Sequence, residues 1–413
     1  MHTVSPVENC VAQLQNKRAN WLLFFFAVFF FMINLFSSMT IFPSYSLAIG
    51  SSPFQAGLQN TVFSLCAVLF RFFLGPVMDR QGSKPLMLVG VFTFATAPAL
   101  LLAYPVYNVL LPVRIYQSLG LAVFLPGIST LLAEMAPPGK TGTYLGLTRI
   151  FYNLALLTGP SGALLVTERY SYETWFIISI ITSTISLILL AAVKVPSIRP
   201  AVEKVAGSLS QIKKAFTQKN IYPVVGGIVL ISFIYSAVLS FAAVYIKTAA
   251  PDMEAAYFFI IVGLAGIAAS LTAGIVSDLL GRQKVIWPLL IVLGLAAIGF
   301  YLLPFIPAIF IILAIMFGSA IQGSSLTLTA WLLDISKPAL RATTISIQEN
   351  TIDIMFALSA LIFGFAAQGP GLGTAFLVAG IFTVLAVFPL KRAAAGSEQR
   401  RPQSQASKST RNT

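Results

Sequence analysis

The stretch GPVMDRQGSKPL, residues 75–86, decides the fold because a second version of it occurs later in the chain. GIVSDLLGRQKV, residues 274–285, repeats its first glycine, the aspartate four residues later and the glycine three residues after that, at an offset of 199. Each version is a short polar segment between two long apolar runs. The sequence therefore predicts a chain built from two related halves.

A longer pair of stretches supports the same repeat. TLLAEMAPPGKTGTYLGLTRIFYN (130–153) aligns with AWLLDISKPALRATTISIQENTID (330–353) at an offset of 200. The aligned pairs include Glu134 with Asp334, Pro138 with Pro338, Thr143 with Thr343, Arg149 with Glu349 and Asn153 with Asp353. We expect two equivalent helices that carry opposite charges at one depth.

Composition places both halves in a membrane. The 413 residues are 57% hydrophobic and only 9% charged, with a mean hydropathy of +0.87, whereas soluble domains carry roughly 25% charged residues. The apolar runs are about 20 residues long, enough to cross a ~30 Å hydrocarbon core. They are apolar on all sides, which excludes a membrane barrel of alternating strands. The predicted fold is an all-α polytopic membrane protein with twelve spans: 21–42, 56–77, 85–104, 107–132, 142–166, 173–193, 222–246, 255–277, 285–303, 306–332, 342–367 and 371–390.

One long polar segment divides six spans from six. We interpret the first span as an anchor, because no small-residue cleavage pattern follows it. The predicted organisation is an N-terminal tail (1–20), an N-terminal six-helix bundle (21–193), a linker (194–221), a C-terminal six-helix bundle (222–390) and a disordered basic tail (391–413).

The basic residues predict the orientation. Of the 26 Lys and Arg, Arg169 and Lys247 lie on the side opposite the termini, and Arg71, Arg114 and Arg149 lie within spans. The other 21 lie on the side of the termini. The positive-inside rule then predicts cytoplasmic termini and linker, in the plasma (inner) membrane. The basic balance is thus a topology signal, and nucleic-acid binding is not expected.

Three stretches resemble motifs of the major facilitator superfamily. Residues 75–86 resemble its signature loop, although Ser83 stands where the family has arginine or lysine. RIYQSLG (114–120) resembles its fourth-span motif, with Ser118 in place of a glycine, and TGPSGALL (158–165) resembles a truncated antiporter motif. The resemblance implies two pseudo-symmetric six-helix bundles, alternating access, and a cytoplasmic gate at Gly75, Asp79, Arg80, Gly82, Asp278, Gly281 and Arg282.

The charges within the spans are the candidate coupling residues. The resemblance implies a role for Arg114 in proton coupling or binding. Arg149, Glu349 and Asp353 lie roughly 10–18 Å along their helices, where a charge facing lipid costs several kcal/mol. We expect Arg149 to pair with Glu349, either as part of coupling or as a permanent structural pair, and Asp353 to carry the proton because it has no ready partner. Arg71 is expected to extend to the membrane interface.

Polar and aromatic residues at similar depth are the candidate substrate contacts: Asn34, Tyr152, Asn153, Tyr235, Gln322 and Asn350. The predicted function is proton-coupled efflux of a small organic solute, such as a drug-like molecule, a zwitterionic metabolite or a metallophore. The alternative is an uptake symporter for an organic anion or zwitterion held by Arg114 and Arg149.

Other classes of function are not expected. Two cysteines and one histidine supply no metal set, and there is no nucleophile beside a base and no phosphate-binding loop. The sequence therefore predicts no enzyme, no metal and no cofactor. The expected partners are a small-molecule substrate, protons and membrane lipids, with the protein acting as a monomer.

Overall fold

Twelve long helices make up the described parts of the computed structural model, which are residues 6–136, 141–195, 221–336 and 341–398. Each of these twelve is long and apolar enough to cross a membrane, which confirms the predicted fold class. The helices of the first half are α1 (Pro6–Ala48), α2 (Pro53–Gln81), α3 (Ser83–Ala103), α4 (Tyr107–Met135), α5 (Thr141–Arg169) and α6 (Tyr172–Ala192). Those of the second half are α8 (Tyr222–Ala249), α9 (Ala255–Leu280), α10 (Arg282–Leu302), α11 (Phe310–Ile335), α12 (Arg341–Ala366) and α13 (Leu372–Glu398), with a short 3-10 turn, η2 (Pro307–Ile309).

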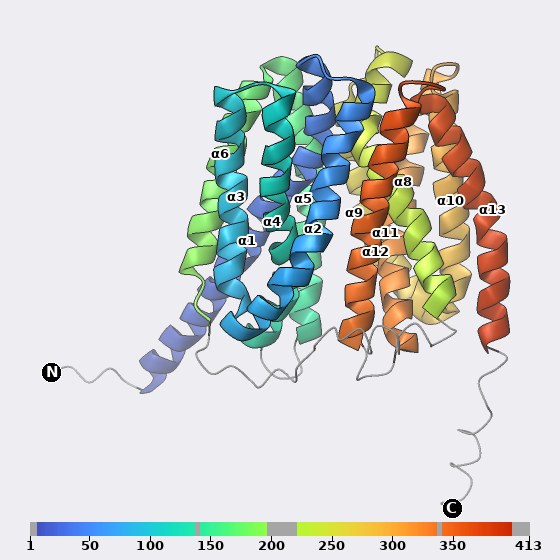
Figure 1. The fold of residues 1–413 in the computed structure, drawn as a ribbon. Coiled ribbons are helices and arrows are strands. Elements are labelled where there is room, and N and C mark those ends of the chain that lie inside the picture. The colour runs from blue at the N-terminus through green and yellow to red at the C-terminus, as the bar shows by residue number, and fades with distance from the viewer. Residues whose placement is uncertain (1–5, 137–140, 196–220, 337–340, 399–413) are drawn as a thin grey trace, which may run out of the picture.

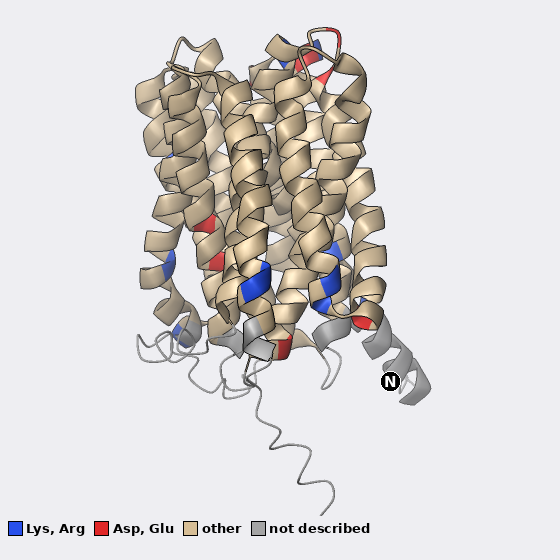
Figure 2. Cartoon of the chain, turned by 90° about the vertical axis from the view of Figure 1, so that its right-hand side faces the viewer, with Lys and Arg blue, Asp and Glu red and all other residues tan. Residues whose placement is uncertain are grey.

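The two halves stand side by side, as Figure 1 shows. The start of α1 and the end of α13 lie on one face of the molecule, here called the terminal face, and the other is the opposite face. Lys and Arg positions gather toward the terminal face (Figure 2). This distribution agrees with the charge pattern of the sequence, and the cytoplasmic placement of that face stays a prediction.

Two glycines give the repeated hairpins the same backbone shape. Gly82 separates α2 from α3 with φ of 89°, and Gly281 separates α9 from α10 with φ of 94°. Their N–H groups donate to the carbonyls of Met78 (2.8 Å) and Ser277 (3.1 Å), four residues earlier. A positive φ is strained for a residue with a Cβ, which explains the glycine in both copies. The alignment at an offset of 199 therefore coincides with a real structural repeat at these turns.

The halves meet through repeat-related helix pairs, because α2 packs against α12 and α5 packs against α9. Glycines allow both approaches. A Cβ on Gly57 would overlap the carbonyl of Ala360, and a Cβ on Gly263 would lie 2.6 Å from the Leu157 side chain. Such close packing of small residues is the usual means of holding membrane helices together. Both contacts lie on the side of the opposite face.

Each half also has its own aromatic core. In the first half Phe31 of α1 stacks on Phe124 of α4, with ring centroids 3.7 Å apart. In the second half Phe300 of α10 stacks on Phe376 of α13 at 4.5 Å. Aromatic pairs contribute about 0.5–1.5 kcal/mol beyond simple burial. These contacts hold the helices of each bundle together.

Candidate functional site

A buried ion pair joins the two halves. Nη2 of Arg71, on α2, lies 2.7 Å from Oδ2 of Asp353, on α12, and the two side chains are only 13% and 6% exposed. Nη1 of Arg71 donates to Oδ1 of Asn350 at 2.9 Å. Asn350 and Asp353 lie three residues apart and so share one face of α12. One guanidinium therefore binds two side chains of the other half.

This pair corrects two expectations from the sequence. The side chain of Arg71 does not extend to the membrane–water interface, because it binds Asp353. Asp353, which was expected to have no partner, is paired with Arg71. The candidate span ends at Met78, close to the predicted residue 77, and α2 itself continues to Gln81, about 15 Å along the helix from Arg71. From that depth the carboxylate on the adjacent helix is within reach of the guanidinium.

The expected pair between Arg149 and Glu349 does not form. No ion pair within 4 Å joins these two described residues; Arg149 is exposed and Glu349 is partly exposed. The guanidinium carbon of Arg149 lies 5.8 Å from the ring centroid of Tyr152. The repeat places Arg149 and Glu349 at equivalent positions, but α5 packs chiefly on α1 and α9 whereas α12 packs chiefly on α2 and α8. Arg149 and Glu349 therefore occupy equivalent positions in the two halves without being in contact.

Two tyrosines, one from each half, lie beside these charges. Tyr152 of α5 lies near Arg149, whose guanidinium carbon is 5.8 Å from its ring centroid, and near Glu349 and Asp353, and Tyr235 of α8 lies near Tyr152. The hydroxyl of Tyr235 is buried and has no hydrogen-bond partner among the described residues. The site thus combines carboxylates, a free phenol and aromatic faces.

Further rings line the same region. Phe36 of α1 meets Tyr152 edge-on at 4.9 Å, and Phe356 of α12 meets Tyr235 edge-on at 5.5 Å. Apolar rings next to a few polar groups are typical of small-molecule sites. The arrangement places aromatic faces next to carboxylates of α12.

The other cross-half interface has a neutral counterpart of the ion pair. Nδ2 of Asn153, on α5, donates to Oγ of Ser270, on α9, at 3.4 Å. The repeat relates Asn153 to Asp353 at an offset of 200 and Ser270 to Arg71 at an offset of 199. At equivalent positions, the interface between α2 and α12 therefore has a charged pair and the interface between α5 and α9 has a neutral one.

Two other predicted cavity residues contact helices of their own half. Asn34 donates to Thr182 (2.8 Å) and accepts from Ser179 (2.7 Å), both on α6, beside a crevice of about 170 Å³ between α1, α5 and α6. Asn34 thus lines a crevice within the first half, and its expected contact with substrate stays a prediction. Gln322 of α11 packs against Gly266 of α9. Hydrogen bonds between helices of one half thus satisfy Asn34, which the sequence shows only as a polar position.

The antiporter-like motif has a packing role. A Cβ on Gly159 of α5 would lie 2.8 Å from the carbonyl oxygen of Ile33 on α1, whereas Gly162 has open space beside it. Gly159 therefore permits α5 to lie directly on α1.

Arg114 is fully buried and has no carboxylate within 4 Å among the described residues. Its Nη1 donates to Oε1 of Gln117 at 3.0 Å and its Nη2 to Oδ1 of Asn60 at 2.7 Å. The guanidinium also lies over the rings of Phe63 (3.8 Å) and Phe42 (4.7 Å). Neutral acceptors and ring faces take the place of a counter-ion here.

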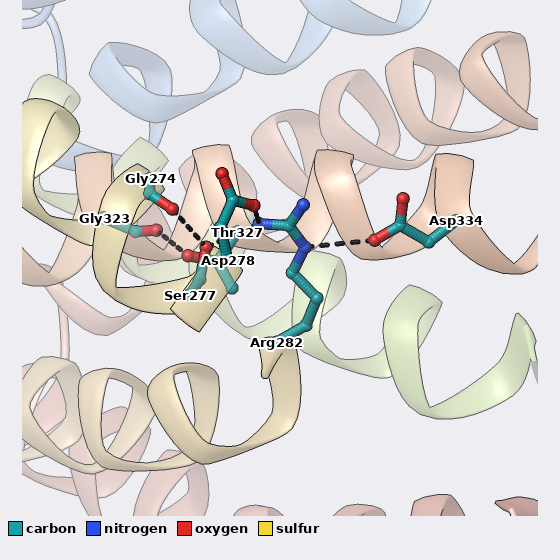
Figure 3. Close-up of polar contacts among 7 residues, drawn as sticks. All are labelled: Gly274, Ser277, Asp278, Arg282, Gly323, Thr327 and Asp334. Carbon is teal, nitrogen blue, oxygen red and sulfur yellow. Dashed lines mark hydrogen bonds and ion pairs between the residues drawn. The ribbon is translucent and has the colours of Figure 1, made fainter. Parts of the chain in front are cut away.

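The second copy of the hairpin motif forms a cluster at the terminal face, drawn in Figure 3. Arg282 forms an ion pair with Asp278, donates from Nε to Oδ2 of Asp334 at 3.0 Å and donates from Nη1 to Oγ of Ser277 at 2.7 Å. These contacts fasten α9, α10 and α11 to one another. All of them lie within the second half.

The first copy lacks that cation, because Ser83 stands at the position that corresponds to Arg282. Lys84 instead donates to the carbonyls of Ala191 (2.8 Å) and Val193 (2.6 Å) at the end of α6, where unpaired helix carbonyls favour a cation. The side chain of Asp79, a predicted gate residue, lies outside the described side chains. Arg80 is exposed.

Helical spans, a two-half architecture and a polar site between the halves define a membrane transporter. The family model of the Major Facilitator Superfamily matches residues 24–348. The chain belongs to this superfamily, which confirms the resemblance seen in its motifs; its family and fold are those of transporters rather than enzymes.

The chain resembles two curated drug-resistance proteins over part of its length. It is 21% identical to the quinolone resistance protein NorA of Staphylococcus aureus over 136 residues, 33% of this chain and 35% of NorA. It is 28% identical over 135 residues to the multi-drug resistance efflux pump PmrA of Streptococcus pneumoniae, 32% of this chain and 34% of PmrA. The matched segment spans about a third of the length of each relative.

Solved structures match nearly the whole chain in fold. The nucleoside transporter NupG has a TM-score of 0.72 at 15% identity, covering 91% of this chain and 98% of its own. The D-xylose-proton symporter has a TM-score of 0.71 at 14% identity, covering 90% and 96%. At these identities the likeness concerns the fold alone.

Proposed function

We propose that this protein is a proton-coupled exporter of small organic solutes in which the Arg71–Asp353 pair is the coupling site. The observation that carries the proposal is a buried carboxylate paired with a cation across the boundary between two halves that must move relative to each other. Asp353 is 4% exposed as a whole residue. A change in its protonation alters the force between the halves directly.

The attraction between Arg71 and Asp353 depends on whether Asp353 carries a proton. Ionised Asp353 holds the guanidinium of Arg71, since separating a buried pair leaves an uncompensated charge at a cost of about 3–5 kcal/mol. A proton on Asp353 removes its charge and leaves Asn350 as a neutral acceptor for Arg71. Protonation of Asp353 therefore favours the state in which α2 and α12 separate. A proton can shift the equilibrium between two conformations only when it binds one of them more tightly than the other.

The cargo we propose is amphipathic and cationic or zwitterionic. The aromatic faces of Tyr152 and Tyr235 can hold an apolar ring, and Glu349, which has no cation within 4 Å among the described residues, can receive a positive group. Similarity to NorA and PmrA favours export. We expect the terminal face to be cytoplasmic.

An uptake symporter remains the second candidate. The observation in its favour is that Arg114 and Arg149 have no carboxylate within 4 Å in the described part of the chain, so either could attract an anionic group. The fold is shared with the D-xylose-proton symporter.

The test is transport under an imposed pH gradient in everted and right-side-out membrane vesicles, with the fluorescent cation ethidium as the probe. We expect Asp353→Asn to retain exchange without a gradient but to lose pH-driven accumulation. Asn153→Ala, at the neutral counterpart position, is the matched control and should remain coupled. Normal pumping by Asp353→Asn would show that the proton is carried elsewhere. Accumulation of probe only in right-side-out vesicles would instead support uptake.

A further inference from the structure

A buried amide connects four helices on the side of the opposite face. Oδ1 of Asn60, on α2, accepts from Arg114 of α4 at 2.7 Å. Its Nδ2 donates to the carbonyl of Met39 on α1 at 3.0 Å and to Oγ of Ser240 on α8 at 2.9 Å. Asn60 is 3% exposed, and Ser240 is the one partner in this set that belongs to the second half.

All four residues lie at one level of the molecule. Asn60 and Arg114 lie seven residues, and Met39 and Ser240 nine residues, from the helix ends at the opposite face, or about 10–14 Å along each helix. We call this set the Asn60 bridge. Its level is deep enough to exclude competition from surface water.

Other contacts close the halves at the same face. The hydroxyl of Thr61 donates to the carbonyl of Ala357 on α12 at 3.0 Å, next to the bridge. Nearer the surface, Nζ of Lys247 lies 3.5 Å from Oε1 of Glu168, which joins the ends of α8 and α5. The structure therefore holds the opposite face closed, and opening it must break the bond between Asn60 and Ser240.

The charge of Arg114 fixes which way the amide points. A buried cation without a carboxylate needs oxygen acceptors, and Gln117 and Asn60 supply them. The oxygen of Asn60 must face the guanidinium, so its NH₂ group must face Met39 and Ser240. A hydrogen bond to a charged group is stronger than a neutral one and polarises the next bond in the chain.

We propose that Asn60 is a positioning residue that links the buried charge of Arg114 to closure of the opposite face. The guanidinium orients the amide, and the amide binds Ser240 of the other half. When the face opens, Asn60 keeps Arg114 and Met39, which belong to its own half, and releases only Ser240. Opening breaks only the hydrogen bond between Asn60 and Ser240 in this set, and the charge of Arg114 stays paired with its acceptors. The contact can therefore break and re-form in every cycle. This inference rests on the proposed alternation between two states.

The test measures the distance between the halves at the opposite face. Spin labels at Tyr170, after α5, and Asp252, after α8, occupy exposed positions in the two halves. The labels are placed in a variant with Cys10→Ser and Cys66→Ser, and distances are measured by double electron–electron resonance without substrate or pH gradient. We expect Ser240→Ala to raise the ratio of open to closed populations roughly 2- to 10-fold, as expected for one net hydrogen bond.

Ser236→Ala is the matched control. Ser236 is one turn earlier on α8 and is also buried, but its hydroxyl donates to the carbonyl of Phe356 within the second half at 3.0 Å. We expect it to leave the distance distribution unchanged. Equal distributions for Ser240→Ala and Ser236→Ala would overturn the proposal.

Asn60→Asp combined with Ser240→Ala separates positioning from simple support of Arg114. Aspartate gives Arg114 a stronger acceptor and can still bind Ser240, by accepting from its hydroxyl. In the double variant Asn60→Asp with Ser240→Ala, the bond to the second half is absent while Arg114 keeps its acceptor, so the melting temperature should be retained while the open population rises. A closed fraction equal to that of the wild type would contradict the proposal. If this variant does not fold, Ser240→Ala alone decides. None of these outcomes depends on Asp353, so failure of the bridge and failure of the proton-coupling proposal are distinguishable.

Discussion

Arg71 and Asp353 form an ion pair at 2.7 Å between the two halves, at the position where the repeat-related interface has a hydrogen bond between Ser270 and Asn153. The two interfaces are alike in geometry and different in charge. Only the charged one changes its strength when a proton binds. Of these two repeat-related contacts, only the Arg71–Asp353 pair contains a group that can bind a proton.

The ion pair should appear as strong coupling in a double-mutant cycle. Arg71→Met and Asp353→Met each leave a buried group without its partner, and each should lower the unfolding free energy by about 3–5 kcal/mol. The double variant should recover much of that loss. Melting in detergent measures all four proteins.

The pair Arg149→Met and Glu349→Met is the control for that cycle. These residues occupy repeat-equivalent positions but do not pair, so their effects should add within about 0.5 kcal/mol. Strong coupling between them, or none between Arg71 and Asp353, would contradict the contacts described.

The hairpin glycines should be sensitive to a methyl group. Gly82→Ala and Gly281→Ala place a Cβ on a backbone with positive φ and should each lower stability by about 1–3 kcal/mol. Gly75→Ala, in the same motif but with open space around it, should change stability little. Equal melting temperatures for all three would show that the turn can relax at no cost.

Gly57→Ala should oppose closure of the opposite face, because the new Cβ would overlap the backbone of α12 at Ala360. We expect a cysteine placed near the end of α12 on that face to react faster with a water-soluble maleimide. Gly162→Ala, which has open space beside it, is the control. An unchanged rate in Gly57→Ala would mean that α2 and α12 adjust without separating.

Twelve spans, the two related hairpins and the family could all be predicted from the sequence, because hydrophobic length and a repeated motif are local signals. The partners of individual charges could not. Arg71 was placed near the membrane–water interface because it lies only seven residues from the end of its span, and the sequence does not show that a carboxylate of α12 lies beside it. The repeat aligned Arg149 with Glu349 but carries no information on which helices pack together.

Asn60 was missed although a signal for it exists. It is an amide within an apolar run, at the same distance from the opposite face as Arg114. Matching polar residues by depth, across helices that enter from the same side, would have brought the two together. Its link to Ser240 needs the packing of α1, α2 and α8, which no local pattern specifies.

The most direct test of the central claim is the distance between α2 and α12 near the terminal face as a function of pH. Spin labels on the terminal-face ends of the two helices report it in wild-type protein and in Asp353→Asn, without substrate. We expect the wild-type distances to shift from short at alkaline pH to long at acidic pH, because protonated Asp353 no longer holds Arg71. Asp353→Asn should show the long distances at every pH. A pH-dependent shift in Asp353→Asn with the wild-type midpoint would contradict the account.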